Sequence, residues 1–299
     1  MPCRIVCTMQ APMSTDWADR IVSTPSLGGR PAQHDLCLIL GGVDTGKTTL
    51  AAALAGRLTP NGPVGIIDAD IGQSHIGPPA TVGWALVDKS IEDLTQLTPG
   101  GISFVGDITP VGHLLQLTAA ITQCVRQVSN VTERIVIDTP GFIAGPAATA
   151  LWWSVQRIVQ PKLIVAVQRE NELSDILAGV QNLGSQLELL KASPQIPAKS
   201  PQARRSYRQN QFRRYFQDSR LHKFKLSGVT VQATRNSGGE SLISRLVALR
   251  DQEGIDRAVG IIDHGQGDGD IASVRAPQLD ISQICCIVVG DVTVDLAGQ

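Results

Sequence analysis

A glycine-rich segment carries the clearest chemical signal in the chain. It matches the pattern G-x-x-x-x-G-K-[ST] of a phosphate-binding loop, and its residues are Gly41, Gly42, Val43, Asp44, Thr45, Gly46, Lys47, Thr48 and Thr49. In such a loop, backbone N–H groups and the start of a helix point at a polyphosphate. Lys47 would reach the β- and γ-phosphates, and the Thr48 hydroxyl would bind Mg²⁺. These residues predict a site for a nucleoside triphosphate.

Two carboxylates follow at the end of an apolar run. They are Asp68 and Asp70, which lie 21 and 23 residues after Lys47. A P-loop phosphotransferase needs carboxylates to hold Mg²⁺ and to take the proton from the acceptor hydroxyl. We therefore expect Asp70 to act as the base and Asp68 to lie on the metal side. Asp138 ends another apolar run and competes for the metal role, while a turn cap is the alternative role for each acid.

The run Asp138-Thr139-Pro140-Gly141 matches D-x-x-G, which senses the γ-phosphate in GTPases. It leaves open a regulatory GTPase or an NTP-dependent interaction protein that performs no phosphotransfer. The chain contains no N-K-x-D sequence, the tetrapeptide that recognises guanine, so this alternative has less support. Phe142 follows in the same loop and could stack on a base, although core packing is the ordinary role of such a residue.

A basic segment, residues 199–225, contains nine Lys or Arg residues and one acid, a local net charge of +8. The remaining chain carries a net charge of −9, so the total of −1 hides this segment. Arg204, Arg205 and Arg208 recur at helical spacing and predict a lid, residues 199–216, that neutralises charge on the transferred phosphoryl group. The segment could also bind a nucleic-acid backbone, and a solvated surface helix is the simplest alternative.

Short apolar runs alternate with segments rich in helix formers, and these elements would position the residues described above. Strands are expected at residues 36–40, 64–67, 102–105, 134–137 and 163–167, and helices at residues 49–57, 112–128 and 144–158. Such alternation is typical of a mostly parallel sheet with helices on both faces. Each acidic or glycine-rich motif follows the end of an expected strand. The predicted fold is therefore an α/β P-loop NTPase that binds ligands at the carboxyl ends of its strands.

The chain divides into three predicted parts. They are an N-terminal segment, residues 1–34, a P-loop domain that includes the lid, residues 35–225, and a small C-terminal β-rich region, residues 226–299. The first part shows only a possible short helix at residues 16–22. In the last part, strands are expected at residues 229–232, 258–262, 284–289 and 292–296, with one helix at residues 239–250.

Composition limits the class of protein. The chain has 299 residues, 42% of them hydrophobic, and contains no apolar run long enough to cross a membrane. We expect neither a membrane partner nor a secretory signal. The six cysteines form no C-x-x-C pair, and we interpret those in apolar runs as buried side chains in a reducing compartment. These features together predict a cytoplasmic protein.

In combination, the motifs resemble those of the polynucleotide 5′-hydroxyl kinases, the P-loop RNA kinases of mRNA 3′-end, tRNA and rRNA processing. The similarity covers about residues 15–235. Its motifs, in order, are G-x-x-D-x-G-K-[ST] at 41–48, D-x-D-x-G-Q at 68–73, G-x-x-x-P at 106–110, T-x-G-[aromatic] at 139–142, and an Arg-rich lid that ends in Tyr215-Phe216. The D-x-D-x-G-Q motif together with the lid is far more specific than the phosphate-binding loop alone.

The resemblance implies Mg²⁺-dependent transfer of the γ-phosphate of ATP to the 5′-hydroxyl of single-stranded RNA or DNA. It implies that Lys47 and Thr48 bind phosphate and Mg²⁺, and that Asp70 lies near the accepting hydroxyl. The lid residues that would stabilise the transition state are Arg204, Arg205 and Arg208. The residues that would contact the polynucleotide are Gln73, Thr139, Gly141 and Phe142, with the last as a clamp on the terminal base.

Two features differ from the family pattern. The clamp residue is commonly Trp in the family, whereas this chain has Phe142. Larger eukaryotic members have an N-terminal β domain, while only residues 1–34 precede the expected core here, as in a compact prokaryotic-type member.

A small-molecule kinase is a further alternative, since small phosphorylated substrates also recruit arginine. RNA and DNA are not distinguished, because that choice depends on a few contacts to the 2′-hydroxyl.

Overall fold

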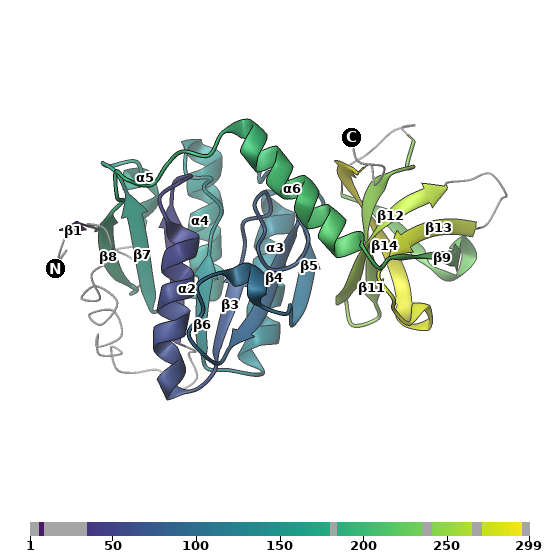
Figure 1. Ribbon diagram of the computed structural model, residues 1–299, viewed down its shortest axis with the longest axis horizontal. Coiled ribbons are helices and arrows are strands. Elements are labelled where there is room, and N and C mark those ends of the chain that lie inside the picture. The colour runs from purple at the N-terminus through teal and green to yellow at the C-terminus, as the bar shows by residue number, and fades with distance from the viewer. Residues whose placement is uncertain (1–5, 9–34, 180–183, 235–240, 265–270, 295–299) are drawn as a thin grey trace.

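The main sheet is built around six parallel strands. The structure, a computed structural model, describes residues 6–8, 35–179, 184–234, 241–264 and 271–294. In spatial order the parallel strands are β1 (Val6–Thr8), β8 (Gln186–Lys191), β7 (Leu163–Gln168), β2 (Asp35–Gly41), β6 (Arg134–Asp138) and β3 (Val64–Asp68). The central strands are almost wholly buried, which is why they consist of continuous apolar runs. The predicted, mostly parallel sheet is confirmed (Figure 1).

Two antiparallel strands extend the sheet beyond β3. They are β4 (Thr81–Val87) and β5 (Gly101–Phe104). The sequence prediction lacks β4 and β8. The first directly follows a loop rich in glycine and proline, and the second is only half-buried for most of its length, so it contains no continuous apolar run. A strand near a sheet edge gives a weak pattern for this reason.

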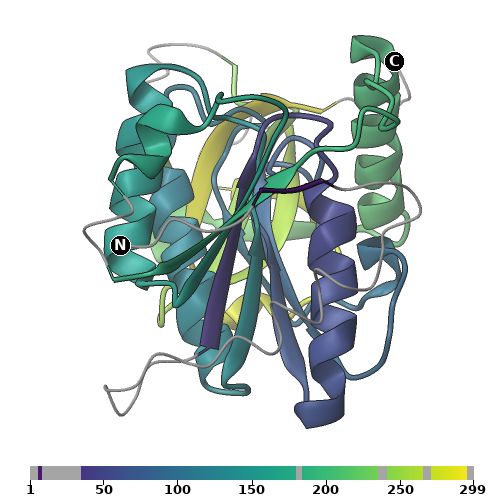
Figure 2. The same cartoon turned by 90° about the vertical axis from the view of Figure 1, so that its left-hand side faces the viewer.

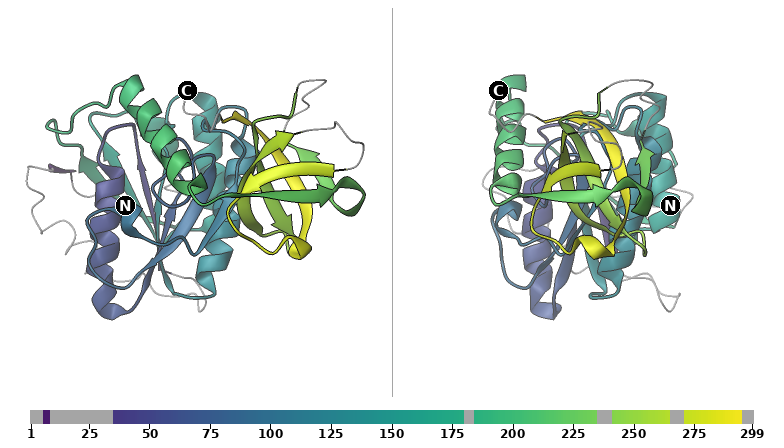
Figure 3. Two further views of the ribbon diagram at one scale, coloured as in Figure 1. Left: turned by 45° about the vertical axis from the view of Figure 1, so that its right-hand side comes forward. Right: turned by 90° about the vertical axis from the view of Figure 1, so that its right-hand side faces the viewer.

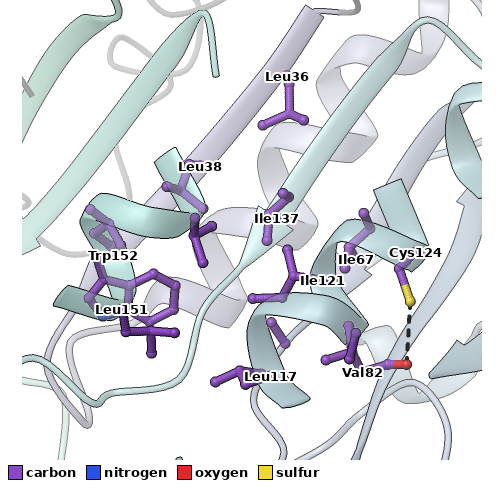
Figure 4. Close-up of a cluster of buried hydrophobic side chains, with 14 of the residues drawn as sticks. Leu36, Leu38, Ile67, Val82, Leu117, Ile121, Cys124, Ile137, Leu151 and Trp152 are labelled. Carbon is purple, nitrogen blue, oxygen red and sulfur yellow. Dashed lines mark hydrogen bonds between the residues drawn. The ribbon is translucent and has the colours of Figure 1, made fainter. Parts of the chain in front are cut away.

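Helices cover both faces of the sheet, as predicted. One face carries α2 (Lys47–Leu58), and the other carries α3 (Leu114–Ser129) and α4 (Gly145–Val159), which lie side by side (Figure 2). Figure 4 shows the core beneath the second face, where Leu117 and Ile121 of α3 meet Ile137 of β6. The short helices are α5 (Ser174–Leu177) and the 3₁₀ turns η1 (Thr59–Asn61), η2 (Leu94–Gln96), η4 (Leu226–Gly228) and η5 (Ile281–Gln283).

A second, smaller group of strands packs against the edge of the main sheet. It contains β9 (Arg220–Lys225), β10 (Thr230–Ala233), β11 (Arg245–Asp251), β12 (Asp256–His264), β13 (Ile271–Ala276) and β14 (Ile284–Thr293). Their spatial order is β9-β13-β12-β11-β14-β10, and β12 joins this group to β5 through Asp256 and Ile102. By its pairing with β13, β9 belongs to this group, although the sequence prediction places residues up to 225 in the P-loop domain.

Two expectations for this region are wrong. Residues 245–251 form the buried strand β11 rather than the end of a helix, because β12 and β14 pair with it on both sides. The strand expected at residues 284–289 continues to Thr293 as β14, so the start of the strand expected at 292–296 belongs to it, while residues 295 and 296 lie outside the described residues. The apolar residues of 241–250 fit either period, and only their pairing partners decide between helix and strand. The short helix expected at residues 16–22 lies outside the described residues.

Helix α6 (Pro201–Phe216) connects the two groups of strands. It begins where the Ser200 side chain caps the Ala203 N–H, and Pro201 takes the first turn, where no N–H partner is needed. Phe212 and Phe216, at its far end, are buried in the core of the C-terminal strands. Figures 1 and 3 show the helix crossing from the carboxyl edge of the main sheet to these strands. Among the described residues, no helix is long and apolar enough to cross a membrane.

Candidate active site

The phosphate-binding loop joins β2 to α2 through left-handed backbone conformations. Gly46, directly before the helix, has φ 89°, and Asp44 has φ 55°, which is uncommon for a residue with a side chain. Gly41 lies against β7, where an added Cβ would come within 2.5 Å of the Val167 carbonyl oxygen. These positions explain the glycines of the motif. The first N–H groups of α2 have no partner within the helix and are available to a ligand.

The side chain of Lys47 folds back on its own loop. Its Nζ donates a 2.7 Å hydrogen bond to the carbonyl oxygen of Gly42, which also accepts from Thr45 Oγ1. Only 7% of Lys47 is exposed, and burial lowers the pKa of its ammonium group, against the opposing effect of Asp138. The positive charge of a buried ammonium group is poorly compensated when its hydrogen-bond partner is a neutral carbonyl oxygen. An anion that entered the loop would therefore gain a strong interaction.

Asp68 and Asp138 lie side by side at the ends of β3 and β6, where they face each other in the parallel ladder. Both are fully buried. Thr48 Oγ1 donates a 2.6 Å hydrogen bond to Asp138 Oδ2, whereas Asp138 Oδ1 is buried with no hydrogen-bond partner among the described residues. Burial, and then the charge of Asp68, raises the pKa of Asp138 to about 7. An unpartnered carboxylate oxygen beside the loop threonine suits a hard cation such as Mg²⁺.

The carboxylate of Asp68 is already engaged with the backbone. Its Oδ1 accepts from the Asp70 N–H at 3.0 Å, and its Oδ2 accepts from the N–H groups of His75 at 2.5 Å and Ile76 at 3.1 Å. These bonds hold the loop that follows β3. Asp68 therefore shapes the segment that carries Asp70, and it has fewer lone pairs left for a metal than Asp138.

Asp70 is half-buried at the start of the same loop. Its Oδ1 accepts hydrogen bonds from the N–H groups of Gly72 at 3.1 Å and Gln73 at 3.0 Å. Its Oδ2 accepts none from the described residues. Burial, and then the charge of Asp68, raises the pKa of Asp70. This carboxylate is thus oriented by the backbone, has one free oxygen, and holds a proton more readily than an ordinary aspartate.

The tip of the phosphate-binding loop is held from two sides. Arg204 of α6 forms an ion pair with Asp44, with 2.5 Å between NH2 and Oδ2, and the Lys199 N–H donates to the same oxygen at 3.1 Å. From the other side, Arg169 donates hydrogen bonds to the carbonyl oxygens of Val43 and Asp44. No role was predicted for Arg169 from the sequence. The signal that could have identified it is the polar run that directly follows the expected strand at residues 163–167.

Helix α6 also rests on the loop that follows β3. Tyr207 Oη and Gln211 Nε2 both donate to the carbonyl oxygen of Ser74, at 3.2 and 2.9 Å. Gln73 Nε2 donates to the carbonyl oxygen of Arg204 at 3.3 Å, and to that of its neighbour Gly72. The predicted substrate residue Gln73 therefore contacts the lid in this structure. The lid is docked over the loop that follows β3 and carries Asp70, which we call the acidic loop.

Two of the three predicted lid arginines form no ion pair with the residues that the structure describes. Neither Arg205 nor Arg208 forms an ion pair with a described acid, in contrast to Arg204. The pKa of Arg208 is lowered, first by burial and then by the positive charges of Arg204 and Arg205, while Asp70 opposes this shift. Arginines that repel each other next to an acidic loop form a site that an anion would relieve.

The loop that follows β6 packs closely on the phosphate-binding loop. Thr139 Oγ1 donates a 2.7 Å hydrogen bond to the carbonyl oxygen of Ile39 in β2. A Cβ added to Gly141 would come within 2.7 Å of the Val43 nitrogen, so only glycine allows this approach. Thr139 and Gly141, predicted to contact substrate, thus fix the position of the loop that carries Phe142.

Phe142 borders an open cleft beside the phosphate-binding loop. The cleft has a volume of about 580 Å³. Its lining residues are Gly42, Val43, Gly141, Phe142, Ile143, Ala144, Arg169, Glu170 and Glu172. Phe142 also packs against the core, and its carbonyl oxygen accepts a 2.7 Å hydrogen bond from Trp152 Nε1 (the indole of Trp152 is labelled in Figure 4). Phe142 therefore packs against the core, the ordinary role considered from the sequence, and also lines the cleft. Its stacking on a base stays a prediction.

A protein-family model matches residues 41–218, which include the phosphate-binding loop, the acidic loop and the lid. The model describes the mRNA cleavage and polyadenylation factor CLP1 P-loop. The chain belongs to the CLP1 P-loop family. The match covers the segment that forms the geometry described above, so the family assignment and the site rest on the same residues.

Curated relatives and solved structures agree with this family. The chain is 35% identical over 217 residues to Polyribonucleotide 5′-hydroxyl-kinase PH0197 of Pyrococcus horikoshii, covering 70% of this chain and 59% of that protein. It is 30% identical over 207 residues to Polyribonucleotide 5′-hydroxyl-kinase MJ1315 of Methanocaldococcus jannaschii, covering 69% and 57%. The chain thus spans less than two thirds of these relatives. The Clp1p chain of a Clp1p–Pcf11p complex has the same fold, with a TM-score of 0.64, 13% identity, and coverage of 93% and 77%.

Proposed function

We propose that this protein transfers the γ-phosphate of ATP to the 5′-hydroxyl of RNA or DNA in a Mg²⁺-dependent reaction. The observation that carries the proposal is the convergence of three groups at one edge of the sheet. They are a phosphate-binding loop, a half-buried aspartate with an oxygen that accepts no hydrogen bond from the described residues, and a docked helix with two arginines that form no ion pair with them. The name of the archaeal relatives, Polyribonucleotide 5′-hydroxyl-kinase, supports the same reaction.

Thr48 and Asp138 are the residues that fit Mg²⁺ best. The buried, unpartnered Asp138 Oδ1 provides an anionic oxygen, and Thr48 Oγ1 lies 2.6 Å from the other oxygen of the same carboxylate. A bound Mg²⁺ would neutralise charge on the β- and γ-phosphates. Burial, and then the charge of Asp68, raises the pKa of Asp138, so this carboxyl would hold its proton more readily until a cation is present. Asp68, the acid first expected on the metal side, would act in this way rather than as the main ligand.

Asp70 is the proposed general base. A carboxylate with a raised pKa is a better proton acceptor than an ordinary aspartate, and the pKa of Asp70 is raised by burial and by Asp68. The Gly72 and Gln73 N–H groups fix Oδ1, so Oδ2 is left to accept the proton of the 5′-hydroxyl. Lys47 would exchange its bond to the Gly42 carbonyl for one to phosphate, and Arg205 and Arg208 would neutralise the transferred group.

The acceptor nucleotide is proposed to enter the cleft beside Phe142. This cleft borders both the phosphate-binding loop and the loop after β6, so a base against the Phe142 ring would lie close to the donor phosphates. Stacking on an aromatic ring tolerates all bases, which suits an enzyme that modifies 5′ ends rather than one sequence. Because Phe offers a smaller ring than the Trp common in the family, we expect the 5′-terminal base to be held less strongly.

The reaction itself is tested with γ-labelled ATP and 5′-hydroxyl RNA and DNA oligonucleotides. We expect label on the oligonucleotide in the presence of Mg²⁺, and no transfer by Lys47→Ala, which removes the ammonium of the phosphate-binding loop. Arg126→Ala, an exposed side chain of α3 far along the chain from the loop, is the matched control. Label released as free phosphate, with GTP preferred to ATP, would instead favour the regulatory GTPase.

A pH-dependent stability is expected from Asp138. Its pKa of about 7 lies above the ordinary value of 3.8, so the folded state prefers the protonated form, and stability falls as the pH rises from about 4 to 7. Asp138→Asn removes this cost and keeps a hydrogen-bond partner for Thr48. We expect the free energy of unfolding of this variant to exceed that of the wild type at pH 8 by a few kcal/mol, at ~1.4 kcal/mol per pKa unit. Near pH 4 the two proteins should be equally stable.

The same variant is expected to lose phosphotransfer, since an amide offers Mg²⁺ no anionic oxygen. Thermal unfolding across pH and the labelled-ATP assay measure the two effects separately. A variant that is less stable than the wild type at pH 8 would show that the buried, ionised Asp138 does not destabilise the fold.

A further inference from the structure

The positive charges of the C-terminal half of the molecule are distributed unevenly between its strands. Among the described residues, four arginines of β11, β12 and β13 each form an ion pair with an aspartate. These pairs are Arg245–Asp291, Arg250–Asp256, Arg257–Asp251 and Arg275–Asp263. Along the end of α6 and along β9, the described structure contains no such pairs. In the described part of these strands, the cations without an ion pair therefore lie in the stretch formed by the end of α6 and β9.

We call this stretch the basic track, and its members share an exposed side chain without an acidic partner among the described residues. They are Arg213, Arg220, Lys223 and Lys225. Arg214 is exposed as well, but its charge interacts with the carboxylate of Asp93. Arg213 donates to Asn210, which is neutral and leaves its charge uncompensated. The acid closest in sequence, Asp218, is exposed and forms no ion pair with them. Uncompensated cations on an otherwise acidic chain indicate an anionic partner.

The track is rigidly connected to the lid. Phe212 and Phe216 bury the end of α6 in the core of the C-terminal strands, and Tyr215 Oη accepts a 2.9 Å hydrogen bond from the Val259 N–H of β12. Strand β9 begins at Arg220, directly after the turn that ends the helix, and pairs with β13 along its whole length. Figures 1 and 3 show β9 leading away from the end of α6. The lid and the track therefore form one continuous support.

The side chains of β9 alternate between core and solvent. Phe224 is buried, and His222 is bonded to the Pro277 carbonyl oxygen, whereas Leu221, Lys223 and Lys225 are exposed. Residues two apart on a strand point to the same side, about 7 Å from each other. Lys223 and Lys225 thus form a regular row of two cations, without a pocket and without a hydrogen-bonding pattern that would read a particular side chain. A row of this kind fits a polymer whose negative charges repeat along its backbone.

We propose that the basic track binds the phosphates of the polynucleotide strand downstream of its 5′-terminal nucleotide. The proposal rests on the proposed function, because that function places the 5′ end beneath Arg205 and Arg208 of the lid. From Arg208 to Lys223, the helix and strand rises give a path of roughly 20–25 Å. A strand with its 5′ end in the site would therefore need several nucleotides to reach β9, within the ~4–16 nucleotides of known single-strand sites.

The test compares oligonucleotides of two lengths. In the variant Lys223→Ala/Lys225→Ala we expect the KM for a 5′-hydroxyl strand of about 15 nucleotides to rise about tenfold, because two phosphate contacts are lost. Each lost contact should also reduce the slope of log K against log salt by ~0.7. The KM for a strand of about three nucleotides and the kcat for both should stay at wild-type values. Fluorescence anisotropy with the long strand, at several salt concentrations, measures the same loss without catalysis.

Matched variants separate charge from fold. Lys89→Ala/Arg126→Ala removes two exposed cations from the main domain and should leave the binding of both strands unchanged. Lys223→Arg/Lys225→Arg keeps both charges and should retain wild-type affinity. Equal KM values for long strands in the wild type and the double-alanine variant would overturn the proposal. It would also be overturned if the double-alanine variant lost as much affinity for a poly-glutamate peptide as for the long strand, because that result would indicate an acidic protein partner.

The two proposals fail in different ways. If the wild type transfers no phosphate but the anisotropy shows a lysine-dependent affinity for long strands, the proposed reaction is wrong and the track stands. If phosphate is transferred and the double-alanine variant binds long strands as the wild type does, the track is wrong and the reaction stands.

Discussion

Replacing Arg205 and Arg208 together by alanine is expected to lower kcat by about 10³-fold or more, the range known for arginines that stabilise phosphoryl transfer. Both guanidinium groups lie on the docked lid and form no ion pair with a described acid. Burial, and then the positive charges of Arg204 and Arg205, lower the pKa of Arg208. The charge that develops on the transferred phosphoryl group would satisfy both. Steady-state rates with labelled ATP measure the effect, and ATP affinity should change far less.

Two controls define this result. Arg126→Ala removes an exposed arginine outside the lid and outside the basic track, and its kcat should stay within about twofold of the wild type, as for most exposed side chains. Arg205→Lys/Arg208→Lys keeps the charge but loses the planar guanidinium, so an intermediate rate is expected. If the double-alanine variant keeps more than a tenth of the wild-type kcat, the lid arginines do not act on the transition state.

Asp70→Asn is expected to lower kcat by about 10²–10⁴-fold, the usual contribution of a general base. The amide keeps the size of the side chain and an oxygen for the Gly72 and Gln73 N–H groups, so the loop should keep its shape. The wild-type rate should fall on the acid side, because a proton on Asp70 blocks proton acceptance, and the raised pKa of Asp70 moves this fall towards neutral pH. The variant should lack this acid limb.

The pH–rate profiles of both proteins measure this difference, with ATP binding as the control for folding. An acid limb with the same midpoint in Asp70→Asn would assign the titration to another group. Asp138 is the obvious candidate, since its pKa is also raised, to about 7. The Asp138→Asn variant then distinguishes the two, because its loss of phosphotransfer accompanies a gain in stability.

Much of the P-loop domain could be predicted from the sequence. Strands such as β2, β3 and β6 are apolar runs that end in polar motifs, and their parallel pairing brings these ends together at one edge. The failures lie where the pattern is ambiguous. Residues 245–251 contain apolar residues that fit a helix or a strand, and pairing with β12 and β14 makes them β11. Half-buried β8 shows no apolar run because it lies towards the edge of the sheet.

By itself, the sequence determined the chemistry available to this protein. The phosphate-binding loop is contiguous, and its glycines, Lys47 and Thr48 have meaning by local spacing alone. The carboxylates Asp68, Asp70 and Asp138 follow apolar strands, so their place at the ligand edge also follows from local pattern and the rule for parallel sheets. The same holds for the arginine-rich helix, whose charge is visible in its composition.

Only the tertiary structure decided which role each of these groups takes. Arg204 is equivalent to Arg205 and Arg208 in the sequence, but it pairs with Asp44, 160 residues away, and so holds the lid on the loop. Asp68 binds backbone N–H groups, whereas Asp138 keeps a buried oxygen free. Such differences depend on burial and on partners distant along the chain, and these set the pKa values and the unpaired charges. No local pattern contains that information, because it arises only when the strands pair and the lid docks.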